Sequence, residues 1–228
     1  MTLLTPDDLA AVLLSLRVAL VAVVSALPVA LAVAYALARG RFPGRALLDA
    51  AAHLPLVLPP VATGFALLVL FGRHGLLGHA LERMGVVLAF RWTGAALAAA
   101  VMAFPLMVRP IRLAIEAIDR EVDEAARTLG AGPLTRFLRV TAPLAAPGLA
   151  AGAVLGFAKA LGEFGATITF VAAIPGETLT LPTAIYQATQ SPGGEGHTLV
   201  LCGISVVIAL GAVLLSDALS RNRARRES

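Results

Sequence analysis

Residues 124–143 read EAARTLGAGPLTRFLRVTAP, a polar, glycine-containing stretch inside a strongly apolar chain. Of the 228 residues, 58% are apolar and 14% are charged, and the mean hydropathy is +0.86. Soluble domains carry about 25% charged residues. The composition therefore excludes an ordinary soluble fold. It predicts an all-α integral membrane protein in which the quoted stretch lies outside the apolar spans.

Five apolar runs approach the ~20 residues that a membrane-spanning helix needs. They cover residues 18–38, 54–71, 92–108, 140–176 and 198–216. In the second run, Pro55, Pro59 and Pro60 are compatible with a broken helix that lines a cavity or with an ordinary helix start. We expect about five transmembrane helices in one integral unit. Its parts are an N-terminal extracytoplasmic segment (1–10), a transmembrane domain (11–219) and a basic cytoplasmic tail (220–228).

The distribution of arginine predicts the orientation, because basic residues concentrate in cytoplasmic loops. Thirteen arginines fall on one predicted side: Arg39, Arg41, Arg45, Arg109, Arg112, Arg120, Arg127, Arg136, Arg139, Arg221, Arg223, Arg225 and Arg226. Three fall in a loop on the other side: Arg73, Arg83 and Arg91. We therefore expect the N-terminus outside and the C-terminus in the cytoplasm. Arg17, at the outer end of the first run, is expected to reach the lipid headgroups, and the first run is expected to be retained as a helix.

The opening stretch lies in the predicted cytoplasmic loop between the third and fourth runs. Apolar residues spaced 3, 4, 3, 4 predict one helix face: Ile115, Ile118, Val122, Ala125 and Leu129. Acidic residues suit the start of that helix: Asp119, Glu121, Asp123 and Glu124. Gly130 suits a left-handed helix end, and Pro133 suits the first turn of a second helix with Leu134, Phe137 and Leu138 on its apolar face. Such a pair of short helices could be a simple linker on the membrane surface.

The spacing of small residues favours a more specific interpretation. Glu124-Ala125-Ala126, then Gly130 and, further on, Val140-Thr141-Ala142-Pro143, resembles the EAA motif of the membrane subunits of ATP-binding-cassette importers. That motif ends in Ile-x-Leu-Pro, so Val140 and Ala142 depart mildly from it. The resemblance implies a type I importer permease fold in which a coupling helix, within residues 116–143, docks on a separate ATPase. The positions carried over to this coupling role are Glu124, Ala125, Ala126, Leu129, Gly130 and Pro143.

Three longer stretches resemble the molybdate permease branch of that family. They are residues 53–78, 98–119 and 156–186, and the resemblance runs from about residue 10 to 220. It implies import of molybdate, or tungstate, across a bacterial inner membrane by alternating access. A sulfate or thiosulfate permease is the alternative within the family. The resemblance further implies a homodimer, two cytoplasmic ATPase subunits that bind ATP and Mg²⁺, and an extracytoplasmic molybdate-binding protein. No cofactor is expected in this chain, and no nucleic acid among its partners.

Two charges interrupt the fourth run. Lys159 and Glu163 are four residues apart, which places them on one helix face, and charges at membrane depth usually face the protein interior. Together with Thr167 and Thr169 they are candidate pathway or gate residues. The pair could instead neutralise itself within the bundle, and we favour that interpretation because a fixed strong cation would trap a dianion. Residues 164–197 are the predicted landing surface for the binding protein.

Other function classes lack their signatures in the sequence. There is no phosphate-binding G-x-x-x-x-G-K-S/T loop, so a motor must be a separate subunit. The four histidines, His53, His74, His79 and His197, lack the spacing of metal ligands and are expected at interfaces or in loops. An ion-coupled secondary carrier would need several intramembrane acids, and a membrane-embedded enzyme would need a nucleophile or metal cluster. We therefore do not expect an enzyme.

Overall fold

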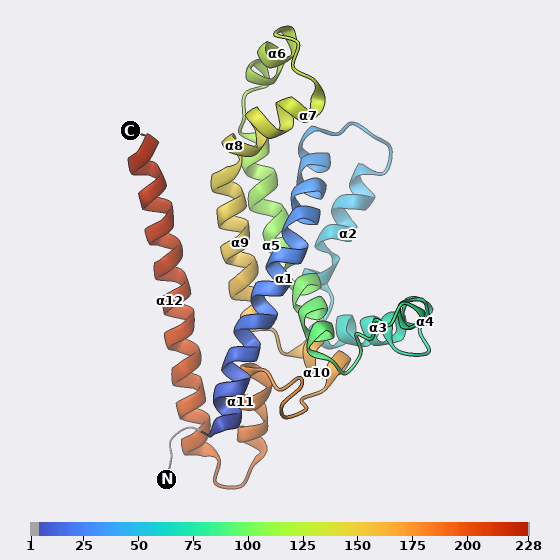
Figure 1. The fold of residues 1–228 in the computed structure, drawn as a ribbon, viewed down its shortest axis with the longest axis vertical. Helices are drawn as coiled ribbons and strands as arrows, with labels where there is room; N and C mark the ends of the chain where they lie inside the picture. The colour runs from blue at the N-terminus through green and yellow to red at the C-terminus, as the bar shows by residue number, and fades with distance from the viewer. Residues whose placement is uncertain (1–4, 228) are drawn as a thin grey trace.

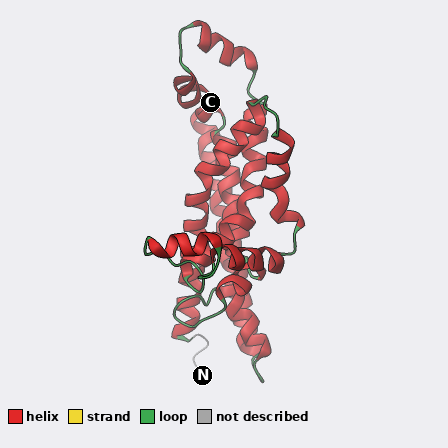
Figure 2. Cartoon of the chain, turned by 90° about the vertical axis from the view of Figure 1, so that its right-hand side faces the viewer, coloured by secondary structure: helices red, strands yellow, loops and turns green. Residues whose placement is uncertain are grey.

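A computed structural model describes residues 5–227, and the side chains of residues 5–211. This part of the chain is helical, without strands (Figure 2). The helices are α1 Pro6–Arg39, α2 Arg45–Val57, α3 Pro60–Phe71, α4 Leu76–Arg83, α5 Trp92–Glu116, α6 Arg120–Thr128, α7 Pro133–Arg136, the π-helix η1 Phe137–Thr141, α8 Ala142–Leu144, α9 Ala146–Leu161, α10 Gly165–Val171, α11 Leu181–Gln190 and α12 Glu195–Glu227.

The long helices run along one axis of the molecule (Figure 1). The helices α6 and α7 lie at one extremity, which we call the α6 end. The beginning of α1 and the helix α11 lie at the opposite extremity, the α11 end. The chain passes from the α11 end to the α6 end along α1, returns along α2, passes up again along α5 and returns along α9.

The first helix begins with a defined cap. The side chain of Thr5 accepts a hydrogen bond from the backbone N–H of Asp8, while the Asp8 carboxylate accepts one from the backbone N–H of Thr5 (2.7 Å). Such a reciprocal capping box satisfies two backbone donors that a helix start leaves free. The helix contains 34 residues, which corresponds to about 50 Å of length. It is therefore longer than the ~30 Å hydrocarbon core of a bilayer.

The centre of the bundle is built from small side chains. The buried face of α1 is largely alanine: Ala19, Ala22, Ala26, Ala30 and Ala34. On α9, Gly148, Gly152 and Gly156 recur every fourth residue and are buried against α5. A Cβ atom at Gly148 would collide with the Cβ atom of Ala114 and lie 2.8 Å from the carbonyl oxygen of Pro110. Small residues at this spacing let helix backbones approach closely, which is how helices associate in a membrane.

Many large apolar side chains face outward, although some, such as Met107, Ile111 and Phe170, are fully buried. Along α1, the exposed residues include Leu13, Leu20, Val24 and Val29, each more than half exposed. In water such a surface would be unfavourable, and in a bilayer it is the surface that contacts lipid. The pattern is thus that of an integral membrane protein.

The predicted second run, residues 54–71, does not form a single helix. The chain forms α2 and α3 instead, which meet at an angle of 115°. Leu58 and Pro59 between them are extended. Proline lacks a backbone N–H and disfavours a helical residue before it, so the adjacent Pro59 and Pro60 end α2 and start α3. Of the two alternatives for the proline-rich segment, the break in the helix is confirmed, and its role in lining a cavity stays a prediction.

The predicted fourth span, residues 140–176, is also wrong in its bounds. The helical path begins near Pro133, bends by 67° at Ala145 and ends at Leu161. Residues 165–171 form the separate helix α10. Gly162 ends α9 outside helical geometry, so the chain turns before it reaches the predicted end.

The number of candidate spans among the searched residues is roughly consistent with the prediction. Two helices, α1 and α5, are each long and apolar enough to cross a membrane, and the two bent pairs bring the number to four. Helix α12 is the candidate for a fifth crossing; its apolar part within the searched residues, 195–211, is shorter than the helices that meet the length for a span. The fifth predicted run, 198–216, falls on α12. The side chains of the predicted tail, 220–228, lie outside the described part.

Polar contacts fix both ends of α1. At the α6 end, the guanidinium of Arg39 donates to the carbonyl oxygens of Ile115 (3.1 Å) and Ile118 (2.8 Å), where α5 ends. At the α11 end, the Ser15 hydroxyl accepts from the N–H of Leu181 (2.6 Å). The carboxylate of Asp8 also lies 3.0 Å from the Nε2 atom of His197 on α12. These contacts join segments up to 189 residues apart.

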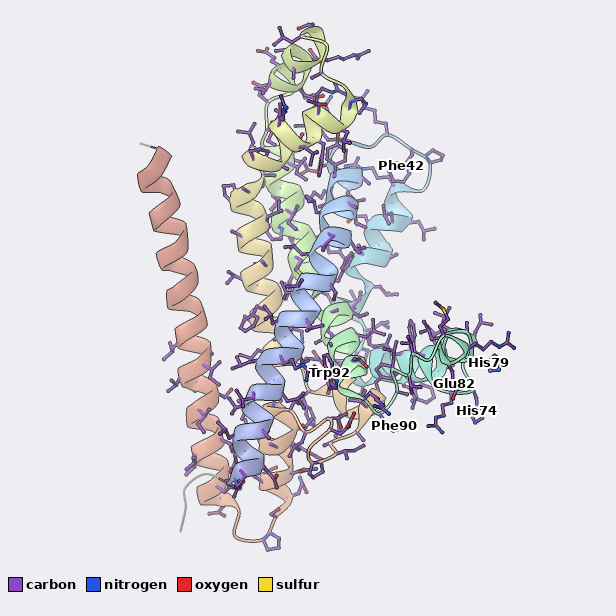
Figure 3. All side chains as sticks on the ribbon, in the orientation of Figure 1. Phe42, His74, His79, Glu82, Phe90 and Trp92 are labelled. Carbon is purple, nitrogen blue, oxygen red and sulfur yellow. The ribbon has the colours of Figure 1, made fainter. Side chains whose placement is uncertain are left out.

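A short arm leaves the bundle near Trp92. Helices α3 and α4 project sideways, and the labelled His74, His79 and Glu82 lie on this arm, away from the bundle axis (Figure 3). The exposed Arg17 stacks on the ring of Trp92, with 3.8 Å from its guanidinium carbon to the ring centre. Arginine and tryptophan are both enriched at membrane interfaces. The expectation that Arg17 reaches headgroups stays a prediction, now with a specific aromatic partner.

The close packing of α5 and α9 can be tested with one side chain. In Gly148→Val, the added Cβ atom would meet Ala114 and the backbone of Pro110, and two methyl groups extend from it. Overpacking of this kind costs about 1–3 kcal/mol, so we expect a lower melting temperature of the detergent-purified protein. Thermal unfolding followed by size-exclusion chromatography measures it. The matched control is Gly203→Val on α12, where nothing lies within 4 Å. Equal melting temperatures for both variants would contradict this account of the core.

Candidate functional site

The opening stretch of the sequence forms a compact helical hairpin at the α6 end, which we call the α6–α7 hairpin (Figure 1). Asp119 caps α6, and its side chain accepts a hydrogen bond from the N–H of Glu121 (3.1 Å). Glu121 and Asp123 occupy the first turn and Arg127 the last. This charge order favours the helix because acids are stabilised at its N-terminus and bases at its C-terminus. The predicted acidic helix start is confirmed.

The predicted single face from Ile115 to Leu129 is wrong. Helix α5 ends at Glu116, and α6 begins only at Arg120. Ile115 is fully buried in the bundle, whereas Leu129 is 88% exposed. The capping of a new helix by Asp119 interrupts the periodicity that spacing alone suggested. Residues 117–119 are therefore a joint between a membrane helix and the hairpin.

The turn of the hairpin depends on Gly130. Its φ angle is +81°, in the left-handed region that side chains other than glycine rarely adopt. Pro133 then starts α7 at the position where its missing N–H costs nothing. Arg136 in α7 contacts Asp123 in α6 at 3.3 Å and holds the two helices together. The predicted glycine turn and the proline start are confirmed.

The outer face of the hairpin is exposed and mixed in character. Glu124 and Ala125 are exposed, and Ala126 is partly exposed. Beside them, Leu129 and Leu134 are 88% and 71% exposed. Exposed apolar residues next to small and acidic ones are typical of a protein interaction surface. Pro143, the last residue to which the sequence analysis gave a coupling role, is exposed. It lies in the short helix α8 and not on α6.

The hairpin is joined firmly to the bundle. Phe137, the first residue of η1, packs edge-on against Tyr35 of α1, with ring centres 5.2 Å apart. From Phe137 the chain continues through η1 and α8 into α9. Single π-turns are frequent at functional sites. The hairpin is therefore in contact with α1 and continuous in the chain with α9.

A second group of candidate residues lies where α9 ends and α10 begins. The Nζ atom of Lys159 is 2.6 Å from Glu163, whose side chain is buried. The other carboxylate oxygen of Glu163 accepts from the N–H of Ala166 (2.9 Å), in the first turn of α10. Glu163 thus neutralises Lys159 and satisfies a free helix donor at once. The pairing of Lys159 with Glu163 is confirmed; whether either contacts a substrate stays a prediction.

Two other candidate pathway residues, Thr167 and Thr169, offer little free hydroxyl surface to a substrate. Thr167 is 2% exposed, and the hydroxyl of Thr169 donates to the carbonyl oxygen of Gly165 within α10 (2.8 Å). Sequence reasoning missed Thr63 on α3, which is 6% exposed and whose hydroxyl has no partner among the described residues. Helix α3 crosses α10 tightly beside it, since a Cβ atom at Gly64 would lie 2.5 Å from the carbonyl oxygen of Ala166.

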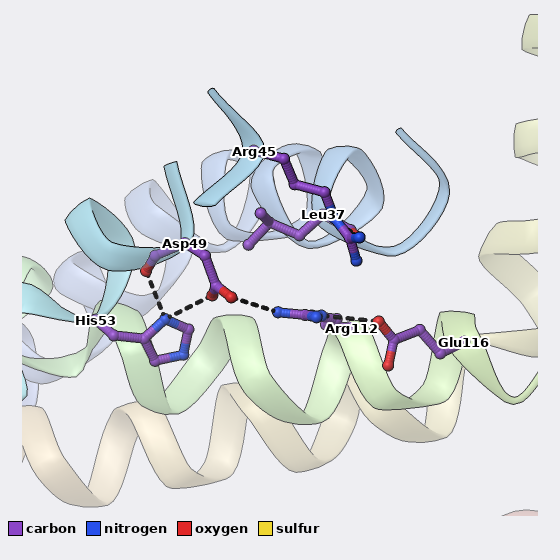
Figure 4. A network of polar contacts seen from close by, with 6 residues as sticks. All are labelled: Leu37, Arg45, Asp49, His53, Arg112 and Glu116. Carbon is purple, nitrogen blue, oxygen red and sulfur yellow. Dashed lines mark hydrogen bonds and ion pairs between the residues drawn. The ribbon is translucent and has the colours of Figure 1, made fainter. Parts of the chain in front are cut away.

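Sequence reasoning also missed a charged chain between α2 and α5 (Figure 4). His53 contacts Asp49 (3.1 Å), Asp49 contacts Arg112 (3.0 Å), and Arg112 contacts Glu116 (2.8 Å). These side chains and Arg109 line an open cavity of about 630 Å³. The spacing of four residues within each helix was visible in the sequence, but the contact across 63 residues was not.

His53, His79 and His197 lie within α2, α4 and α12, whereas His74 lies in the turn between α3 and α4. Of the two expected placements, a loop is confirmed for His74, and an interface stays a prediction for the other three. Among the described residues, no group of three or more histidine, cysteine or acidic side chains could hold a metal ion.

Comparison with known proteins gives a consistent picture. Residues 18–225 match the family described as the binding-protein-dependent transport system inner membrane component. The chain is 54% identical, over 220 residues and 96% of both proteins, to the molybdenum transport system permease protein ModB of Escherichia coli K12. It is 48% identical, with the same coverage, to ModB of Haemophilus influenzae. The sulfate transport system permease protein CysW of Synechococcus elongatus is 38% identical, over 84% of this chain and 68% of that protein.

Solved structures show the same fold. A bacterial ABC transporter involved in the import of the acidic polysaccharide alginate aligns with a TM-score of 0.76 and 19% identity, over 96% of this chain and 80% of that chain. The MetNI methionine ABC transporter, in inward-facing conformations, aligns with a TM-score of 0.71 and 19% identity, over 94% of both chains. The predicted importer permease fold is confirmed.

The role of the Lys159–Glu163 pair can be measured. Lys159→Met leaves a buried carboxylate without its cation, at a cost of about 3 kcal/mol, since removing one partner of a buried pair is strongly destabilising. In Lys159→Met with Glu163→Gln, the amide oxygen still accepts from Ala166 and no charge is left unpaired. We therefore expect thermal unfolding to show a large loss of stability in the single variant and recovery of most of it in the double variant. A double variant as unstable as the single one would refute this account of the pair.

Proposed function

The chain belongs to the family of binding-protein-dependent transport system inner membrane components, and from this premise we propose that it imports molybdate, and its analogue tungstate, by alternating access. The observation that supports this substrate assignment is the 54% identity to a molybdenum permease over nearly the whole chain. The chain is a membrane subunit of an ATP-driven transporter and not an enzyme; ATP hydrolysis belongs to a separate subunit. The ion-coupled carrier and the membrane-embedded enzyme gain no support from these relatives.

The orientation and organisation follow from the distribution of arginine. We place the α6 end in the cytoplasm, because the arginines of the α1–α2 loop and of the hairpin lie there, and the positive-inside rule assigns such a side to the cytoplasm. The N-terminus then lies outside. Residues 11–219 form the transmembrane domain, 116–143 its coupling region, 1–10 an outer segment and 220–228 a basic tail.

The α6–α7 hairpin is the proposed docking element for the ATPase. Its exposed Glu124, Ala125 and Leu129 offer a small, partly acidic and partly apolar face that fits a groove with basic groups. Closure of two ATPase subunits on ATP would draw two copies of the hairpin together in a homodimer. The joint at residues 117–119, the Phe137–Tyr35 contact and the bend at Ala145 would pass this movement to α5, α1 and α9. Coupling works only if the two states of the bundle differ in hairpin position.

The opposite end is the proposed landing surface for an extracytoplasmic molybdate-binding protein. Residues 164–197 lack arginine and lysine, and they form α10, α11, the loops around them and the first residues of α12. Thr178 is fully buried in this region, and its hydroxyl accepts from the N–H of Ile174 (2.9 Å). A loop fixed in this way presents a defined surface to a partner. The path of the anion would pass the crossing of α3 and α10, near Lys159, Glu163, Thr167 and Thr169.

Transport by purified components tests the function. Proteoliposomes should accumulate radiolabelled molybdate only when this chain, its ATPase, the binding protein and ATP are all present, because the chain contains no motor. Excess tungstate should compete. If sulfate competes equally well, the substrate assignment is wrong in favour of the sulfate branch. Uptake by the chain alone under an ion gradient would contradict the whole proposal.

The hairpin turn gives a second test. In Gly130→Val, a branched side chain must adopt φ near +81°, which costs roughly 1–2 kcal/mol and would shift the balance of hairpin conformations by roughly 5- to 30-fold. We expect uptake per ATP hydrolysed to fall while membrane insertion is unchanged. The control is Gly132→Ala, where φ is −65° and the space is open. Unchanged coupling in both variants would mean that the turn geometry does not matter for transport.

A further inference from the structure

A second cavity lies at the α6 end, apart from the hairpin face and from the anion path. It has a volume of about 310 Å³. Its lining comes from the α1–α2 loop and from the α5–α6 joint: Ala38, Arg39, Gly40, Arg41, Arg45, Glu116 and Arg120. We propose that this cavity binds a phosphate-type tetrahedral oxyanion.

The charge around the cavity is unbalanced. Four of its lining residues are arginines and one is an acid. That acid, Glu116, already pairs with Arg112 (2.8 Å), which is not part of the lining. Among the residues whose side chains are described, none of the four lining arginines forms an ion pair. The positive-inside rule explains why arginines lie on this side of the membrane, but it does not require four of them to converge on one cavity.

Two of the arginines are held in place without being neutralised. Arg39 donates to two carbonyl oxygens at the end of α5. Arg45 donates to the carbonyl oxygen of Leu37 through Nε (3.0 Å). A guanidinium has five N–H donors, so both keep donors for a ligand. A site with donors fixed beforehand loses less entropy on binding.

The other two arginines come from two different segments that border the cavity. Arg41 lies in the α1–α2 loop, and Arg120 is the first residue of α6; both are exposed. A cation at the start of a helix is opposed by the helix dipole. An anion between Arg41 and Arg120 would compensate both charges at once. Arginine is suited to this because its planar fork matches the oxygens of a phosphate group.

Two sources could supply this chemistry. One is the phosphate of an anionic phospholipid, since basic pockets between membrane helices on the cytoplasmic side bind such headgroups. The other is a free dianion, inorganic phosphate or delivered molybdate. In either case the ligand would bridge the α1–α2 loop and the first residue of α6. Its occupancy would therefore fix the joint at 117–119 and with it the angle of the hairpin. The inference rests on the proposed function only for which side faces the cytoplasm.

Binding can be measured without transport. The complete transporter is purified in mild detergent and examined by native mass spectrometry after addition of phosphatidylglycerol, and by calorimetry with inorganic phosphate or molybdate. The test variant is Arg41→Gln with Arg120→Gln, neither of which makes a described side-chain contact. Each arginine contributes about fivefold to the affinity for such a charge, so we expect affinity to fall about 25-fold. The control is Arg139→Gln, an exposed arginine outside the cavity, which should bind normally.

The two arms separate the sources. Retained phosphatidylglycerol that the double variant loses identifies a lipid site, and phosphate or molybdate binding that the double variant loses identifies a free-anion site. Either result supports the inference. It is overturned if neither ligand binds, if the control loses binding equally, or if the double variant instead fails to retain the ATPase, because the arginines would then serve the docked subunit. Molybdate uptake by the unchanged transporter is scored separately, so a failure of the proposed function is recognised as such.

Discussion

The close approach of α1, α5 and α9 is the constraint on which the rest of the structure depends. Lipid is as apolar as leucine, so helices in a membrane gain little from burying large apolar side chains against each other. This bundle instead brings backbones together over alanines on α1 and α5 and over Gly148, Gly152 and Gly156 on α9. Many of the large apolar side chains are left on the outer surface, although Met107, Ile111 and Ile115 are buried among the helices. Because close-packed interiors have low compressibility, we expect these helices to move largely as one body.

A bundle that moves as one body can respond to a movement of the hairpin, to which it is joined. A polar element that merely linked two spans would need neither a positive-φ turn nor a cross-helix ion pair such as Arg136–Asp123. Here the hairpin is internally braced, held to α1 through Phe137 and Tyr35, and continuous with both α5 and α9. The exposed face of the hairpin does not take part in the packing of the bundle. The arginine cavity lies at the joint between the two, where an anion would influence the angle at which they meet.

Sequence reasoning recovered what is local. Composition indicated the membrane class, and glycine, proline and acidic residues indicated the caps and the turn of the hairpin. The orientation inferred from the arginines stays a prediction. Sequence reasoning failed where the structure depends on packing between segments that are distant in the sequence. The 115° bend between α2 and α3 was left open because prolines alone fit two outcomes. The Ile115–Leu129 face was wrong because periodicity cannot show that Asp119 starts a new helix. The Asp49–Arg112 contact and the unpartnered Thr63 depend on packing that no spacing reveals.

The central claim is that the exposed face of α6 receives movement from a separate ATPase, and site-specific crosslinking tests it most directly. A cysteine replaces Ala125 after the single native Cys202 is changed to serine, and the complete transporter is treated with a short thiol crosslinker. The account predicts a crosslink from Ala125→Cys to the ATPase subunit, with a yield that changes when ATP binds, and none from Glu177→Cys at the α11 end. A crosslink to the ATPase from Glu177→Cys but not from Ala125→Cys would contradict it.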